Sequence, residues 1–199
     1  MNQIIPGKNQ LVIIFIFISG ISALIYQIAW IREFKLVFGV HVFSTSAVLS
    51  SFMAGLALGS YYFGKLIDKN KKPLFVLLLI EIGIAVFALV FPLFFKGIIE
   101  FYSYLNNAFE LSIGTLQIIR FILAFLLLIV PGSLMGGTIP VISKYFVSSL
   151  HELGNKISKL YSANNIGAVI GCLVAGFLLI RSVGLRNTTL IAASLNLLN

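Results

Sequence analysis

Five long runs of apolar residues constrain this chain more than any other feature of its sequence. The hydrocarbon core of a bilayer is about 30 Å thick, and a helix crosses it with about 20 apolar residues. The sequence predicts five complete spans of this kind, at residues 11–30, 42–66, 74–95, 116–146 and 157–180. A sixth helix, predicted over residues 187–199, is incomplete, because Thr188 to Asn199 rise only about 18 Å.

The composition favours lipid rather than water as the solvent. Apolar residues (AVILMFWYC) make up 59% of the 199 residues and charged residues 10%, whereas an ordinary soluble domain has about 25% charged residues. A soluble fold this apolar would expose large apolar patches and aggregate. We therefore predict an all-α membrane protein in which residues 1–199 form a single transmembrane domain, a bundle of about six helices. The short last helix predicts that the chain is truncated from a longer protein, with a re-entrant last segment as the alternative.

The positive charge fits a membrane surface. The chain has 14 Lys and Arg against 6 Asp and Glu, a net charge of +8, and anionic headgroups attract cationic loops. No stripe of aromatic and basic residues indicates nucleic acid, so the predicted partner is the lipid bilayer. With the N-terminus in the cytoplasm, eight of the Lys and Arg residues lie inside and six outside, which favours this orientation in the cell (inner) membrane. The aromatic segment Gly97–Thr115 is predicted to lie on the membrane surface.

Small residues recur every four positions on two of the predicted helices. Gly55 and Gly59 lie on one face of the second helix, and Gly167 and Gly171 lie on one face of the fifth. Such stripes let helix backbones approach closely in lipid. The simplest interpretation is packing within the chain, and the alternative is a sliding or dimerising seam.

Prolines and glycines interrupt the fourth predicted helix. Pro131 removes a backbone donor and clashes with the preceding turn, and the next turns contain Gly132, Gly136, Gly137 and Pro140. Freed backbone groups must be buried in protein or face a water-filled cavity, and interrupted helices often mark transport sites. A transport site and a packing kink are both consistent with the pattern.

Glu81 is the clearest functional candidate, because an ionisable residue within a span is a functional hypothesis by default. It lies roughly 10 Å into the third predicted helix. Lys144 and Lys159 are predicted at a similar depth, and an ion pair with one of them would neutralise the carboxylate. The two interpretations are a proton or cation site and an internal ion pair.

Polar residues on other helices are further candidates for substrate binding or for lining a cavity. They are Tyr26, Gln27, Arg120, Asn164 and Asn165. Gln27 and Arg120 lie near the outer ends of their helices and could meet, with Glu33 as a neutralising partner, while interfacial anchoring is the alternative. Of the two adjacent asparagines, one is expected to cap or line a cavity while the other packs.

The sequence lacks the patterns that most enzymes need. It contains no phosphate-binding Gly loop after a strand, no zinc-ligand spacing and no Ser-His-Asp set. Its single cysteine, Cys172, cannot form an internal disulfide. We therefore predict no catalytic residue, no metal site and no cofactor within these 199 residues.

One loop resembles a known transporter signature. Gly64, Asp68, Lys69 and Lys72 stand between the second and third predicted helices in a pattern similar to a loop of major facilitator transporters. Lys71 occupies the position of the second glycine of that pattern.

A second resemblance covers nearly the whole chain. Four blocks occur in the order found in the membrane domain of fused spermidine-synthase-like membrane proteins: Ser19–Arg32, Phe52–Ser60, Leu134–Pro140 and Leu160–Ala168. Members of that family often carry Glu where this chain has Gln27, and they commonly continue into a soluble aminopropyltransferase-like domain.

The resemblance implies a bundle like the N-terminal half of a major facilitator transporter. Its first and fourth helices would line a central cavity, and its second and fifth would face an opposite half. A homodimer, a second half or a soluble domain would then be a partner.

The leading hypothesis from the sequence is a membrane domain of a spermidine-synthase-like, transporter-related protein. Such a domain would bind or move a small cationic solute, for example a polyamine, or would anchor a catalytic domain. One alternative is a fragment of a membrane-bound aminopropyltransferase whose catalytic domain lies outside this chain. The other is a purely structural membrane anchor. Family likeness carries these hypotheses more than residue chemistry does.

Overall fold

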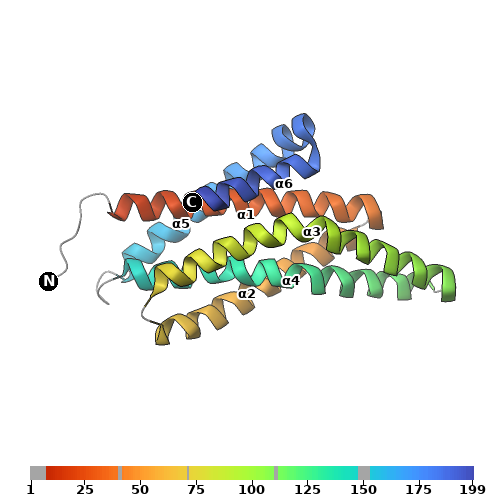
Figure 1. Ribbon diagram of the computed structural model, residues 1–199, viewed down its shortest axis with the longest axis horizontal. Helices are drawn as coiled ribbons and strands as arrows, with labels where there is room; N and C mark the ends of the chain where they lie inside the picture. The colour runs from red at the N-terminus through yellow and green to blue at the C-terminus, as the bar shows by residue number, and fades with distance from the viewer. Residues whose placement is uncertain (1–7, 40–41, 71, 110–111, 148–152) are drawn as a thin grey trace.

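The computed structural model describes residues 8–39, 42–70, 72–109, 112–147 and 153–199, and every element in these ranges is a helix (Figure 1). The elements are α1 (Lys8–Phe38), α2 (Val42–Lys69), α3 (Pro73–Phe109), α4 (Ile113–Phe146), α5 (Leu153–Leu173), the π-helical stretch η2 (Val174–Leu179) and α6 (Ile180–Leu198). Five helical stretches are long and apolar enough to cross a membrane, the fifth being the run through α5, η2 and α6. This confirms the all-helical class and the membrane-spanning length of the helices.

Neighbouring helices run in opposite directions, and the chain reverses once more inside α6 (Figure 1). The last reversal occurs at Gly184, whose φ of 80° and ψ of 172° suit glycine. After this turn, residues 185–198 form a helix of about 21 Å that packs against both α1 and α3. Its end is attached to α1, where the Asn199 Nδ2 donates a hydrogen bond of 3.0 Å to the carbonyl of Phe15.

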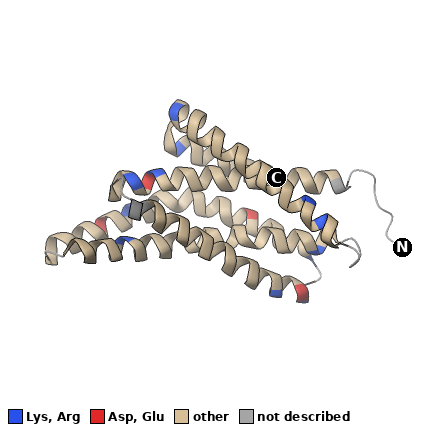
Figure 2. Ribbon diagram, turned by 180° about the vertical axis from the view of Figure 1, so that it is seen from behind, with Lys and Arg blue, Asp and Glu red and all other residues tan. Residues whose placement is uncertain are grey.

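The charged residues gather toward the two ends of the bundle. Figure 2 shows Lys and Arg near the helix ends, while the middle of the bundle is almost entirely uncharged. This distribution is the one expected of helices whose central parts lie in hydrocarbon, where a charged side chain is costly.

The prediction of a separate surface segment over Gly97–Thr115 is wrong. α3 continues without a break to Phe109, and α4 begins directly after Ser112. The extra turns have a buried side, because the Tyr102 ring packs edge-on against Phe38 with the ring centroids 5.3 Å apart. This part of α3 therefore packs against the end of α1.

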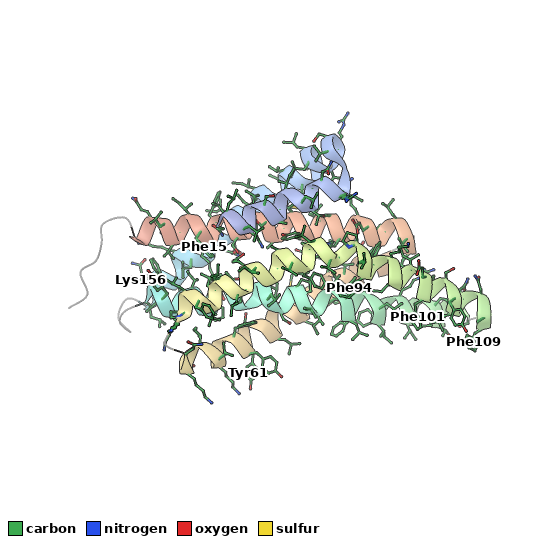
Figure 3. All side chains as sticks on the ribbon, viewed as in Figure 1. Phe15, Tyr61, Phe94, Phe101, Phe109 and Lys156 are labelled. Atoms are coloured by element: carbon green, nitrogen blue, oxygen red, sulfur yellow. The ribbon has the colours of Figure 1, made fainter. Side chains whose placement is uncertain are left out.

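α3 is consequently longer than the hydrocarbon core is thick. Its 37 residues rise about 55 Å, against about 30 Å for the bilayer core. Figure 3 shows Phe101 and Phe109 on the far part of α3, at the opposite end of the molecule from Lys156. One end of the α3–α4 pair therefore extends beyond the hydrocarbon.

Glycines bring α2 and α4 into backbone contact. A Cβ added to Gly55 would lie 2.9 Å from Gly132, and one added to Gly59 would lie within van der Waals overlap of the Ser133 carbonyl. In the other direction, a Cβ on Gly136 would overlap the carbonyl of Leu56. The small-residue stripe of α2 is therefore filled by α4 of the same chain.

A second seam of the same kind joins α1 to α5. A Cβ on Gly167 would overlap the Phe17 carbonyl, and one on Gly171 would overlap the Ile21 carbonyl. The glycine stripe of α5 thus lies against α1, so these glycines are not available to a partner helix or to an opposite half. In lipid, such close approach replaces hydrophobicity as the source of helix association.

α4 is one continuous helix, so the predicted interruption near Pro131 is wrong. The helix survives Pro140 because α2 supplies the missing donor. A proline at position 140 cannot donate to the carbonyl of Gly136, four residues earlier. The Ser60 hydroxyl of α2 donates to that carbonyl instead, over 2.8 Å. This is how a freed backbone group inside a membrane protein is satisfied by a neighbouring helix.

Ser60→Ala should therefore destabilise the bundle by about 1 kcal/mol, because the Gly136 carbonyl loses its donor. In a Pro140→Ala background the alanine amide supplies the bond within α4, and the same serine substitution should be close to neutral. A double-mutant cycle from unfolding in detergent measures this coupling. An equal cost in both backgrounds would contradict this role of Ser60.

Candidate functional site

Glu81 is a buried carboxylate on an otherwise apolar helix face. It lies on α3 about 12 Å from the first residue of the helix, between the buried residues Ile80 and Ile84, and its exposed fraction is 4%. The Ser19 hydroxyl of α1 donates to Glu81 Oε1 over 3.4 Å, which is long for a hydrogen bond. The other oxygen, Oε2, is buried without a hydrogen-bond partner.

Glu81 lines a cavity of about 490 Å³. Residues of α1, α3, the last turn of α6 and one residue of α4 line it. All but three of them are apolar: Leu11, Val12, Ile14, Phe15, Ile18, Leu74, Leu77, Leu78, Ile82, Ile142, Leu197 and Leu198. The polar members are Glu81, Asn196 and Asn199.

Asn196 adds a second unsatisfied acceptor to this cavity. Its exposed fraction is 4%, and its Oδ1 is buried without a hydrogen-bond partner. A buried polar atom that makes no hydrogen bond costs free energy, so each such atom in a native fold needs an explanation. Two unsatisfied oxygens along one cavity point to a ligand that donates hydrogen bonds.

The lysines predicted to neutralise Glu81 lie elsewhere. Lys144 at the end of α4 pairs with Asp68 of α2, its Nζ 3.8 Å from Oδ1. Lys159 lines a separate depression between α1 and α5, beside Ile13 and Phe17. Within the described part of the chain no cation pairs with Glu81, so the predicted ion pair is wrong.

Tyr26 lies on the same side of α1 as Ser19, two turns further along. Its side chain is fully buried, and its hydroxyl has no hydrogen-bond partner among the described residues. The ring stacks on Trp30, with centroids 5.3 Å apart. Tyr26 therefore belongs to the buried core of the bundle and does not line the cavity beside Glu81. Gln27, its neighbour, is also buried and is not among the residues that line the cavity beside Glu81.

Arg120 has a structural role at the far end of the bundle. Its Nε donates to the Tyr102 hydroxyl over 2.9 Å, and its Nη1 donates to the Phe38 carbonyl over 3.1 Å. Among the described residues no hydrogen bond or ion pair joins Arg120 to Gln27 or Glu33. The predicted group of these three residues is therefore not formed, and Arg120 instead connects α1, α3 and α4.

The two asparagines of α5 also lie away from the cavity. Asn164 faces α1, where its carbonyl contacts Gly20, and Asn165 is exposed. Asn164 therefore belongs to the α1–α5 seam.

The loop motif lies at the opposite end of the bundle from Arg120. Asp68 is held by Lys144, and Asn70 Oδ1 accepts a hydrogen bond of 2.9 Å from the Lys72 amide. Gly64, by contrast, has open space where a side chain would point. Lys69 and Lys72 are exposed and add positive charge to this end.

Ser19 and Asn196 are the functional candidates that the sequence interpretation missed. Ser19 lies in a mostly apolar run, and Asn196 lies between Ser194 and Asn199, so the sequence does not distinguish either from neighbouring polar residues. The described residues contain no group of three His, Cys, Asp or Glu side chains that could hold a metal ion. Comparisons of this chain with protein-family models, with curated proteins and with solved structures gave no match.

Proposed function

We propose that this chain is a multi-pass membrane domain that binds a small cationic solute inside its helix bundle, with Glu81 as the charged ligand. The observation that carries the proposal is the Oε2 atom of Glu81, which is buried, has no hydrogen-bond partner and belongs to a residue that lines a cavity. Ionisable residues inside a membrane domain mark solute or ion pathways when they face a cavity.

The polar groups of the cavity select for positive charge. Among the described residues that line the cavity, Glu81 has the one ionisable side chain, and the unsatisfied Asn196 Oδ1 is an acceptor as well. An anion would face a carboxylate in a medium of low dielectric constant, where repulsion is strong. A cation would neutralise the carboxylate and donate hydrogen bonds to both oxygens.

Glu81→Gln should weaken amine binding about 10- to 100-fold, because a hydrogen bond to a charged group is worth about 1.5–3 kcal/mol. The measurement is equilibrium binding of labelled n-butylamine and spermidine to the chain in lipid nanodiscs. Glu100→Gln is the matched control on the same helix, since the Glu100 side chain is exposed and paired only with Lys96. That variant should bind as the wild type does. Equal binding by wild type and Glu81→Gln, with helicity preserved, would eliminate the proposal.

We further propose a relationship to spermidine-synthase-like membrane proteins, and through it to one half of a major facilitator transporter. In support, the four blocks that carry the resemblance contact one another in pairs. Gly55 and Ser60 of one block pack on Gly136 and its neighbours of another, and Gly20 packs on Asn164 in the same way. The relationship implies a polyamine as solute or a catalytic domain in the same gene product. The reading frame beyond Asn199 tests it: an aminopropyltransferase-like domain would support it, and an unrelated domain would oppose it.

We also propose that the chain lies in the cell (inner) membrane with its N-terminus in the cytoplasm. The exposed Lys69 and Lys72 mark the cytoplasmic end in this orientation. A reporter enzyme that works only in the cytoplasm should be active when fused after Lys72 and inactive when fused after Phe109, at the other end of α3. The reverse pattern of activity would invert the orientation.

A further inference from the structure

We infer that the Glu81 cavity takes an amphiphilic monocation, a primary amine that carries an apolar tail, in preference to a polyamine. This inference rests on the proposed function and specifies its substrate class. It follows from the number of charges in the cavity, from its unsatisfied acceptors and from the apolar character of the rest of its wall.

The side chains of the cavity offer one negative charge. Among the described residues that line it, Glu81 has the only ionisable side chain, and none is a lysine or an arginine. A ligand with one positive charge leaves the site neutral. A polyamine would place a second ammonium against leucine and isoleucine side chains, where an unpaired charge is strongly disfavoured.

The acceptors match one ammonium group. A primary ammonium has three donors and no acceptor. Glu81 Oε2 and Asn196 Oδ1 are both buried without hydrogen-bond partners, and both residues line the cavity. A primary ammonium can therefore donate to the unsatisfied oxygens of these lining residues.

The remainder of the wall suits a hydrocarbon tail. Every residue of the lining is apolar except Glu81, Asn196 and Asn199. Leu11, Ile14 and Leu78 line the cavity and are also largely exposed on the flank of the bundle, where Figure 3 shows Phe15. In a membrane this flank faces lipid tails. The volume of about 490 Å³ lies within the range of about 300–1,000 Å³ for small-molecule sites.

Binding of n-octylamine, spermidine and n-octanol to the nanodisc-embedded chain tests this inference. The hydrocarbon tail partitions into lipid equally for every variant. The quantity compared for each ligand is therefore its binding to the wild type minus its binding to Glu81→Gln. We expect octylamine to bind at least about tenfold more tightly than spermidine, since the described lining residues offer the second and third ammonium groups of spermidine no further carboxylate side chain. Octanol, which has the tail without the charge, should show no binding that depends on Glu81.

Two neighbouring leucines on α3 separate the tail site from a general surface effect. Leu78 and Leu79 are similarly exposed, at 54% and 52%, but only Leu78 lines the cavity. Leu78→Asn should weaken octylamine binding several-fold and leave n-butylamine binding nearly unchanged, whereas Leu79→Asn should affect neither.

The outcomes distinguish the two levels of the proposal. Tighter, Glu81-dependent binding of spermidine would overturn the amphiphile inference and leave the cation site intact. The same holds for equal effects of Leu78→Asn and Leu79→Asn on octylamine. If none of the amines shows binding that depends on Glu81, both the inference and the proposed function are overturned.

Discussion

Gly59→Ala should destabilise the bundle by about 3 kcal/mol, at the upper end of the cost of overpacking. The new Cβ would overlap the Ser133 carbonyl oxygen and would lie 2.6 Å from its carbon and 2.8 Å from its Cα. These are backbone atoms of α4, so no side chain can rotate to make room. α2 and α4 must separate, and the contacts along the whole seam weaken together. Thermal unfolding of the detergent-solubilised chain, followed by circular dichroism, measures the loss.

Gly64→Ala provides the matched control for this prediction. Gly64 lies on the same helix five residues later, and a Cβ there would meet nothing within 4 Å. Alanine is the better helix former by up to about 1 kcal/mol, so this variant should be neutral or slightly stabilised. If both substitutions destabilise equally, intrinsic helix propensity rather than the α2–α4 contact controls the effect.

The start and end of several helices could be predicted from apolar runs alone. α2 was expected over 42–66 and spans Val42–Lys69, and α4 was expected from 116 and begins at Ile113. α1 extends further than predicted, to Phe38, and so includes the charged residues Arg32, Glu33 and Lys35. Arg32 donates to the Gly176 carbonyl in η2 over 3.3 Å. A hydropathy profile cannot show this contact, because Gly176 lies 144 residues away from Arg32 in the sequence.

Glu81 was identifiable because it is an acidic residue in an apolar run, but its surroundings were not. Lys144 was expected beside it from depth alone, yet depth does not fix which way a helix is rotated. Rotation of α4 is set by the glycine contacts with α2, and it places Lys144 on Asp68. Asn196 reaches the cavity only because the chain reverses at Gly184, and a single glycine between Val183 and Leu185 does not by itself predict such a turn.

Glu81→Leu should stabilise the isolated bundle and abolish amine binding. On scales of membrane insertion a charged residue at the centre of a helix costs about 2.5–3.5 kcal/mol, and leucine is slightly favourable, so the gain is at most about 3 kcal/mol. The new side chain would join Leu77, Leu78 and Ile82 in an apolar wall. Ser19 would lose its acceptor, which offsets part of the gain, although serine in a helix can donate to a carbonyl of the preceding turn.

Glu100→Leu controls for the removal of a carboxylate from α3 in general. Glu100 is exposed and its ion pair with Lys96 spans 3.8 Å at the surface, so its replacement should change stability by less than about 1 kcal/mol. Unfolding midpoints measure the stability of each variant, and octylamine titrations of the same preparations measure its affinity for the amine. If removal of Glu81 raises stability and abolishes binding, the carboxylate serves binding at a cost in stability and acts as a ligand. A Glu81→Leu variant that is less stable than the wild type would instead make Glu81 a structural residue, with Ser19 as its partner.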